Sequence, residues 1–132
     1  MKILLVSADP KVRETMALTV RSVQRTAGPA EPVQFLEASN GERGISLAWR
    51  HLPEIVVADE IASRAGAFAL ARELKGAAPP FSGKIVILLE RSQDSWLAAW
   101  SGADAWFVKP VNPFELADTV SELLDASQKE AV

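Results

Sequence analysis

Several kinds of residue and motif are missing from this 132-residue chain, and each absence excludes a class of function. Without cysteine there is no disulfide framework, no thiolate metal site and no thiol chemistry, which fits a reducing compartment. Lysine and arginine form no cluster and the net charge is −3, which argues against binding to nucleic-acid phosphates. The opening apolar run is too short for a signal peptide or a membrane span. We therefore expect a cytoplasmic protein that binds neither nucleic acid nor membrane.

Motifs for independent catalysis are absent as well. Neither a catalytic triad nor a paired-carboxylate hydrolase arrangement is visible. Ser7-Ala8-Asp9-Pro10 follows the first apolar run, where a glycine-rich phosphate loop would be expected in a nucleotide-binding domain. His51 is the single histidine, and without a metal-binding partner we interpret it as structural. The sequence thus predicts a protein that is not an enzyme.

What the sequence does contain is a regular alternation of strand and helix patterns. Hydrophobic residues make up 48% of the chain and charged residues 23%, a balance typical of one soluble domain. Short apolar runs bounded by turn residues predict strands over 3–6, 33–38, 55–58, 85–89 and 105–108. Helical spacing predicts helices from 10 to the Gly-Pro pair at 28–29, and over 42–51, 65–75, 95–101 and 113–126. Such alternation implies parallel strands, right-handed crossovers and helices on both faces.

The third predicted strand is the part of the chain around which we organise the rest. Ile55 to Ala58 are all apolar, which is typical of a strand that is buried on both faces of a parallel sheet. Asp59 follows at the carboxyl end of this strand, the end at which ligands and chemistry collect in open α/β sheets. Asp59 is therefore the first candidate site residue.

The most specific motif in the chain is Gly-Ala-Asp-Ala-Trp-Phe-Val-Lys-Pro at 102–110, followed by Asn-Pro-Phe-Glu-Leu at 112–116. It resembles the last strand, lysine-proline turn and last helix of the receiver domain of bacterial two-component response regulators. The stretches 37–42 and 53–59 are similar to the region that ends at the family's phosphoacceptor aspartate. The resemblance covers about residues 2–124. It implies the flavodoxin-like (βα)5 three-layer sandwich with strand order 2-1-3-4-5.

The resemblance also implies roles for individual residues. Asp59 corresponds to the aspartate that accepts a phosphoryl group from a histidine kinase, and Lys109 to the lysine that pairs with the phosphate. Trp106 stands at the place of the switch aromatic. In the family, an acidic pair after the first strand and the acceptor itself hold Mg2+, because charge on the transferred phosphoryl oxygens must be neutralised.

Most of the other family positions differ in this chain. The acidic pair falls on Ser7 and Ala8, and Asp9 comes one position late. The switch hydroxyl falls on Leu89, which cannot donate to a phosphate. A methionine-proline pair that the family favours three residues after the acceptor is replaced by Ala-Ser at 62–63. We therefore expect a degenerate receiver that has no confident metal site, and Mg2+ as a cofactor only if phosphorylation works.

Several residues keep two interpretations. Asp59 is either a working phosphoacceptor or a strand-end carboxylate paired with Lys109. Asp9 is either a residual metal ligand or the cap of the helix that Pro10 begins, and we favour the cap. Glu90 either pairs with Lys109 or faces water, and we favour water. Asp94 is expected to cap the helix over 95–101.

Tryptophan is unusually frequent for a chain of this length, with four in all. Trp96, Trp100 and Trp106 either thicken the core or form an interface on the face built by the predicted elements 95–101, 105–108 and 113–126, with Trp100 the more exposed of the first two. Trp49 is expected to be half-buried. An interface of this kind would support a homodimer.

The sequence supports a signalling module over residues 1–126, followed by a polar tail or linker start over 127–132. The favoured hypothesis is a pseudo-receiver that binds protein partners, such as a histidine kinase, an output domain or a second copy, with weak or no Mg2+-dependent phosphorylation. The alternatives are a working phosphoacceptor in a phosphorelay and, less favoured, a flavodoxin-like domain that binds a small ligand.

Overall fold

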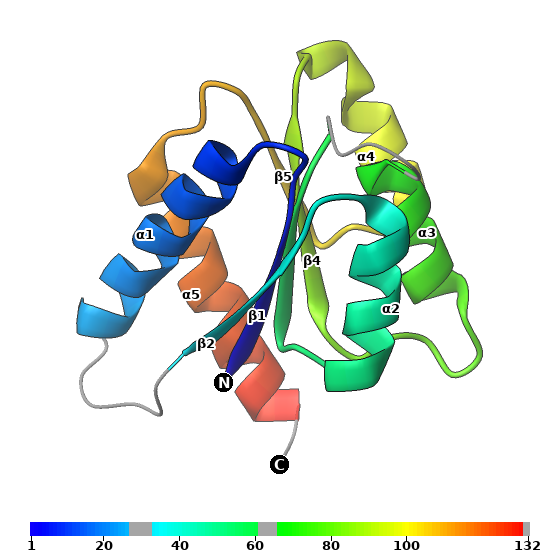
Figure 1. The fold of residues 1–132 in the computed structure, drawn as a ribbon, viewed down its shortest axis with the longest axis horizontal. Coiled ribbons are helices and arrows are strands. Elements are labelled where there is room, and N and C mark those ends of the chain that lie inside the picture. Colours follow the sequence, from blue (N-terminus) through cyan, green and yellow to red (C-terminus); the bar gives the residue numbers. More distant parts are fainter. Residues whose placement is uncertain (27–32, 61–65, 131–132) are drawn as a thin grey trace.

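In the computed structural model, which describes residues 1–26, 33–60 and 66–130, a parallel five-stranded sheet is covered by helices on both faces (Figure 1). The strand order is β2-β1-β3-β4-β5, as the sequence predicts. The elements in chain order are β1 (Lys2–Val6), α1 (Pro10–Thr26), β2 (Gln34–Ala38), α2 (Gly41–His51), β3 (Ile55–Asp59), α3 (Ala67–Gly76), β4 (Lys84–Leu89), η1 (Ser92–Asp94), α4 (Ser95–Ser101), β5 (Ala105–Val108) and α5 (Pro113–Glu130).

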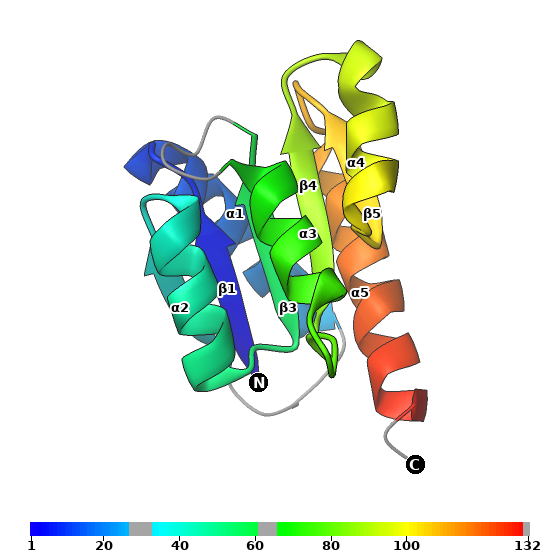
Figure 2. The same cartoon turned by 90° about the vertical axis from the view of Figure 1, so that its right-hand side faces the viewer.

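Two apolar cores lie on the two faces of this sheet. Because side chains alternate along a strand, β1, β3 and β4 each supply residues to both cores, which explains their continuous apolar runs. The core on one face is completed by α1 and α5, and the core on the other by α2, α3 and α4. Figure 2 shows the latter three helices side by side in front of the sheet. The result is the three-layer sandwich expected from the sequence.

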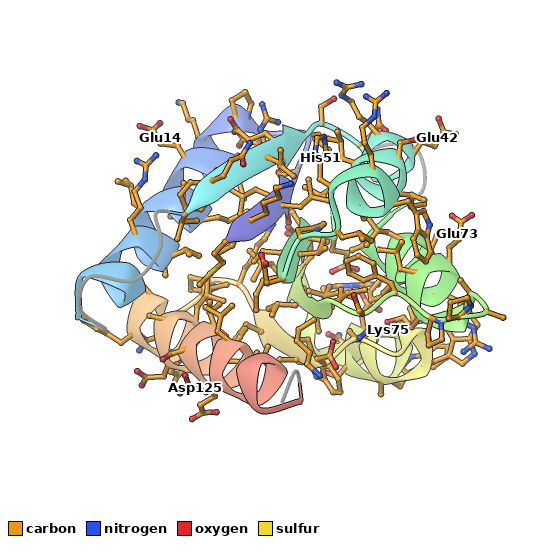
Figure 3. All side chains as sticks on the ribbon, turned by 90° about the horizontal axis from the view of Figure 1, so that it is seen from below. Glu14, Glu42, His51, Glu73, Lys75 and Asp125 are labelled. Carbon is orange, nitrogen blue, oxygen red and sulfur yellow. The ribbon has the colours of Figure 1, made fainter. Side chains whose placement is uncertain are left out.

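Charged residues on the helices mostly point away from the sheet. Figure 3 shows Glu14, Glu42, Glu73 and Asp125 on the outer sides of their helices. Lys75 differs, because it lies between α3 and α4. Its ammonium group forms an ion pair with Asp104 at 3.0 Å and donates to the carbonyl of Gly83 at 2.9 Å. Lys75 therefore connects α3 to the loop before β4, which contains Gly83, and to the loop after α4, which contains Asp104.

The predicted helix boundaries hold within a few residues, with two differences. The last helix extends to Glu130 instead of ending at 126, so most of the expected tail is helical. No glycine or proline interrupts 126–130, and helix-favouring residues let the helix continue. A short 3-10 turn, η1, precedes α4. The predicted end of the first helix at 28–29, the start of the third at 65 and the Ala-Ser pair at 62–63 lie outside the described residues. Within the described residues, no helix is both long enough and apolar enough to span a bilayer.

Candidate functional site

The site lies at the carboxyl edge of the sheet, where β1, β3 and β5 end. Ser7 follows β1, Asp59 ends β3 and Lys109 follows β5. β1 and β3 are neighbours in the sheet, with Val6 paired with Ala58. The backbone of Lys109 continues the ladder by donating to the carbonyl of Leu89. Three residues that are far apart in sequence are thus brought together by the strand order.

Both oxygens of the Asp59 carboxylate are occupied by neighbouring side chains. Oδ2 accepts a hydrogen bond from Ser7 Oγ at 2.8 Å, and Oδ1 forms an ion pair with Lys109 Nζ. Oδ1 accepts no hydrogen bond from any other described group. Ser7 and Asp59 are both completely buried. Ser7, which the sequence resemblance aligns with the first acid of the family, therefore donates to the carboxylate of Asp59.

Lys109 connects the buried carboxylate to a second, exposed one. Its ammonium group also contacts Glu90 Oε1 at 2.6 Å, so Glu90 pairs with the lysine and the favoured interpretation of a solvated Glu90 was wrong. Burial alone would lower the pKa of Lys109, but the hydrogen bonds and charges of Asp59 and Glu90 outweigh it and raise that pKa above its ordinary value. Lys109 is therefore a fixed cation between two carboxylates.

A further acidic pair, which the sequence did not predict, lies beside Glu90. Glu60 follows β3, and its carboxylate accepts a hydrogen bond from the backbone N–H of Glu90. The pKa of Glu60 is raised above its ordinary value, chiefly by burial. The hydrogen bond from the Glu90 N–H lowers this pKa, whereas the hydrogen bond with Asp94 and the negative charges of Asp94 and Glu90 raise it further. Asp94 occupies the N-cap position of α4 but makes no side-chain cap, so that prediction was wrong. Its carboxylate faces Glu60 and Arg91 instead.

The other two residues of the loop after β1, Ala8 and Asp9, supply no carboxylate to Asp59. Asp9 Oδ1 accepts from the backbone N–H of Lys11 at 2.9 Å, which is the favoured cap of α1. The Asp9 backbone N–H in turn donates to Ser7 Oγ at 3.1 Å. Ala8 is exposed and supplies only a methyl group. Within the described residues, no three histidine, cysteine or acidic side chains are grouped so as to hold a metal ion.

Leu89 and Trp106 belong to the same apolar core. Leu89, at the switch-hydroxyl position, is completely buried in the core beneath α2, α3 and α4. Trp106 pairs with Ile87 across β4 and β5 and packs against this core, partly buried. The Leu89 side chain therefore contributes to apolar packing and cannot donate a hydrogen bond.

The other tryptophans are at the surface. Trp96 and Trp100 on α4 are 66% and 53% exposed, so Trp96 and not Trp100 is the more exposed. The Arg72 guanidinium of α3 lies 4.7 Å from the centre of the Trp100 ring, which places this ring on the α3 side of α4. Trp49 is 41% exposed and packs edge-on against Phe81 at 5.8 Å.

Comparison with known proteins finds relatives over nearly the whole chain. Two uncharacterized response regulatory proteins, from the CDC 1551 / Oshkosh and H37Rv strains of Mycobacterium tuberculosis, are each 31% identical to the chain over 130 residues. Each alignment covers 96% of this chain and 92% of the relative. No family model matches the chain.

Solved structures share the fold at lower identity. A CheY-like response regulator receiver domain from Methanospirillum hungatei JF-1 superimposes with a TM-score of 0.76 at 21% identity, covering 98% of this chain and 97% of its own. The receiver domain of a sensor histidine kinase from Pseudomonas aeruginosa PAO1, solved with a magnesium ion in its active site cleft, gives 0.77 at 17% identity and covers 94% and 97%. Taken with the curated relatives, the fold and the strand-end aspartate and lysine lead to one conclusion: the chain belongs to the response regulator family and is a receiver domain.

Proposed function

We propose that this receiver domain acts as a protein-interaction module with little or no Mg2+-dependent phosphorylation. The observation that carries the proposal is the closed contact set of Asp59, whose two oxygens face Ser7 and Lys109 in a completely buried position. A phosphoryl donor would have to displace these partners to reach either oxygen. Such displacement costs free energy, because it breaks a buried hydrogen bond or a buried ion pair.

The donor set around Asp59 does not fit Mg2+. This ion takes oxygen ligands in octahedral geometry and relies on carboxylates and phosphates for charge. Here Ser7 directs a hydroxyl proton at Asp59, Ala8 has no oxygen in its side chain and Asp9 binds the first turn of α1. Lys109 already neutralises Asp59. These contacts favour a domain held in one conformation over a working phosphorelay switch.

The first test compares partner binding by the wild-type chain and Asp59→Asn. Because asparagine keeps an acceptor for Ser7 and cannot be phosphorylated, both chains should capture the same proteins in similar amounts from a lysate of the source organism. Immobilised chains and quantitative mass spectrometry give the measurement, and Asp118→Asn on α5 is the matched control. Loss of a captured histidine kinase or effector only in Asp59→Asn would favour the phosphorelay alternative.

For the partner surface we propose the exposed indoles of α4. Large exposed aromatic side chains are frequent anchors of protein interfaces. Trp96 and Trp100 are one helical turn apart, and the contact of Trp100 with Arg72 extends this surface toward α3. Trp106 packs against the core instead. The proposed surface therefore lies across α3 and α4, displaced from the face that includes α5.

Trp100→Glu tests whether this surface joins two copies of the chain. Because the ring is 53% exposed, the variant should fold normally, and a charge at the interface should convert a dimer into a monomer. Light scattering measures the mass and circular dichroism the fold. Leu18→Glu, at a 54% exposed position on α1, is the matched control. A wild-type monomer, or a dimer that both substitutions leave intact, would remove self-association through this surface.

A further inference from the structure

We propose that the groove between α1 and the start of α5 is a binding site for a small amphipathic organic anion. The groove has a volume of about 350 Å3 and lies between α1 and the β5–α5 loop, next to Lys109. Figure 1 shows α1 and α5 together on one face of the sheet. This inference does not depend on whether Asp59 is phosphorylated.

The lining of the groove is suited to an apolar ligand body. Val12 and Met16 from α1 face Val111 and Leu116 from the β5–α5 region, and Leu88 of β4 also lines the groove. The volume lies within the range of small-molecule sites, about 300 to 1,000 Å3, and such sites are mostly apolar. The groove also opens at the carboxyl edge of the sheet, where ligands of open α/β domains bind. Phe114, which is 77% exposed, follows the lining residue Pro113 in the first turn of α5.

The charge of the groove determines the polar end of the ligand. Lys11 and Lys109 both line it, and no acidic side chain does. Because Lys109 already pairs with Asp59 and Glu90, Lys11 supplies the charge that remains for a ligand. Lys11 lies in the first turn of α1, and its ammonium group forms no ion pair within the described residues. A carboxylate or sulfonate next to an aromatic or alkyl body therefore fits this site.

A ligand in this groove would be coupled to Asp59 through Lys109. The same lysine lines the groove and contacts Asp59 and Glu90. An anion that attracts its ammonium group competes with these two carboxylates. Ligand binding would thus change the contacts of the buried aspartate without any covalent modification.

The experiment uses 8-anilinonaphthalene-1-sulfonate, an aromatic sulfonate, as the probe. Calorimetry measures its affinity for the folded chain, and amide chemical shifts locate its site. Thr15→Phe fills the groove from α1 and should weaken binding about tenfold, because the probe loses the burial of an aromatic ring. Lys11→Glu should weaken it by about the same factor, because it reverses the neighbouring charge. Leu18→Phe, on α1 outside the groove, is the matched control and should bind like the wild-type chain.

The possible outcomes distinguish specific binding in the groove from nonspecific binding of the probe. The site is supported by saturable binding with chemical-shift changes at Val12, Val111 and Lys109. Thr15→Phe and Lys11→Glu must each weaken this binding, and Leu18→Phe must leave it unchanged. Shifts centred on Trp96 and Trp100 would overturn it, as would binding that all variants share or an absence of binding. Because no phosphodonor is used, failure here leaves the proposed function of Asp59 unaffected.

Discussion

Replacing Lys109 with methionine is expected to lower the free energy of unfolding by about 3 kcal/mol, because it leaves Asp59 buried without its counter-charge. The Asp59 side chain is completely buried, so water cannot easily replace the lysine as a partner of the carboxylate. The Lys109 side chain itself is 24% exposed. Removing one member of such a pair costs more than the pair contributes to stability. Urea denaturation at neutral pH, followed by far-UV circular dichroism, gives the measurement.

Two further variants show whether the loss comes from the buried charge. Glu90→Gln removes the other contact of Lys109, but at a 44% exposed side chain, and should cost less than about 1 kcal/mol. Adding Asp59→Asn to Lys109→Met removes the buried charge itself and should recover most of the lost stability. If Lys109→Met lowered the free energy of unfolding no more than Glu90→Gln does, the ion pair between Lys109 and Asp59 would not stabilise this end of the sheet.

Introducing Ser7→Asp and Ala8→Asp together should create the Mg2+ site that we propose the wild-type chain lacks. Two carboxylates would then stand next to Asp59, and their added negative charge should raise Mg2+ affinity by about a hundredfold. Ser7→Asp also removes the hydroxyl that occupies Asp59 Oδ2. A Mg2+ titration followed by intrinsic tryptophan fluorescence, which includes Trp106, measures the affinity.

The matched control is the uncharged pair Ser7→Asn and Ala8→Asn. These substitutions have nearly the same size and supply oxygen atoms without charge, so they should gain little affinity. If the asparagine pair gained as much Mg2+ affinity as the aspartate pair, the result would contradict our proposal that missing negative charge weakens Mg2+ binding in the wild-type chain. Equal Mg2+ affinity in the wild-type and aspartate chains would likewise contradict the proposal.

The fold was predictable because buried strands and helix ends each have a recognisable residue pattern. The four apolar residues from Ile55 to Ala58 identify a central strand, and Pro10 and Gly102 mark where helices begin and end. The end of α5 was missed, since the sequence after Ala126 has no residue that stops a helix. The cap of α4 was missed for a different reason. Asp94 has a neighbouring acid, Glu60, and the sequence does not show that the two are close.

The site was predictable only in part. Asp59 and Lys109 follow their strands directly, and parallel strands bring their carboxyl ends to one edge, so their pairing was foreseen as one of two interpretations. The Ser7 hydrogen bond to Asp59 and the pairing of Glu90 with Lys109 depend on side-chain rotamers, which sequence patterns do not specify. The direction of Trp100 toward Arg72 depends in the same way on how α4 rotates about its axis.

Whether Asp59 is closed to phosphorylation can be measured from the amide chemical shifts of the wild-type chain, recorded while Mg2+ and then beryllofluoride, a phosphoryl mimic, are added. We expect no saturable shifts at Ser7, Asp59 or Lys109, because the carboxylate keeps its two present partners. Saturable shifts at these residues that depend on both additions, and that disappear in Asp59→Asn, would contradict this expectation and identify a working phosphoacceptor.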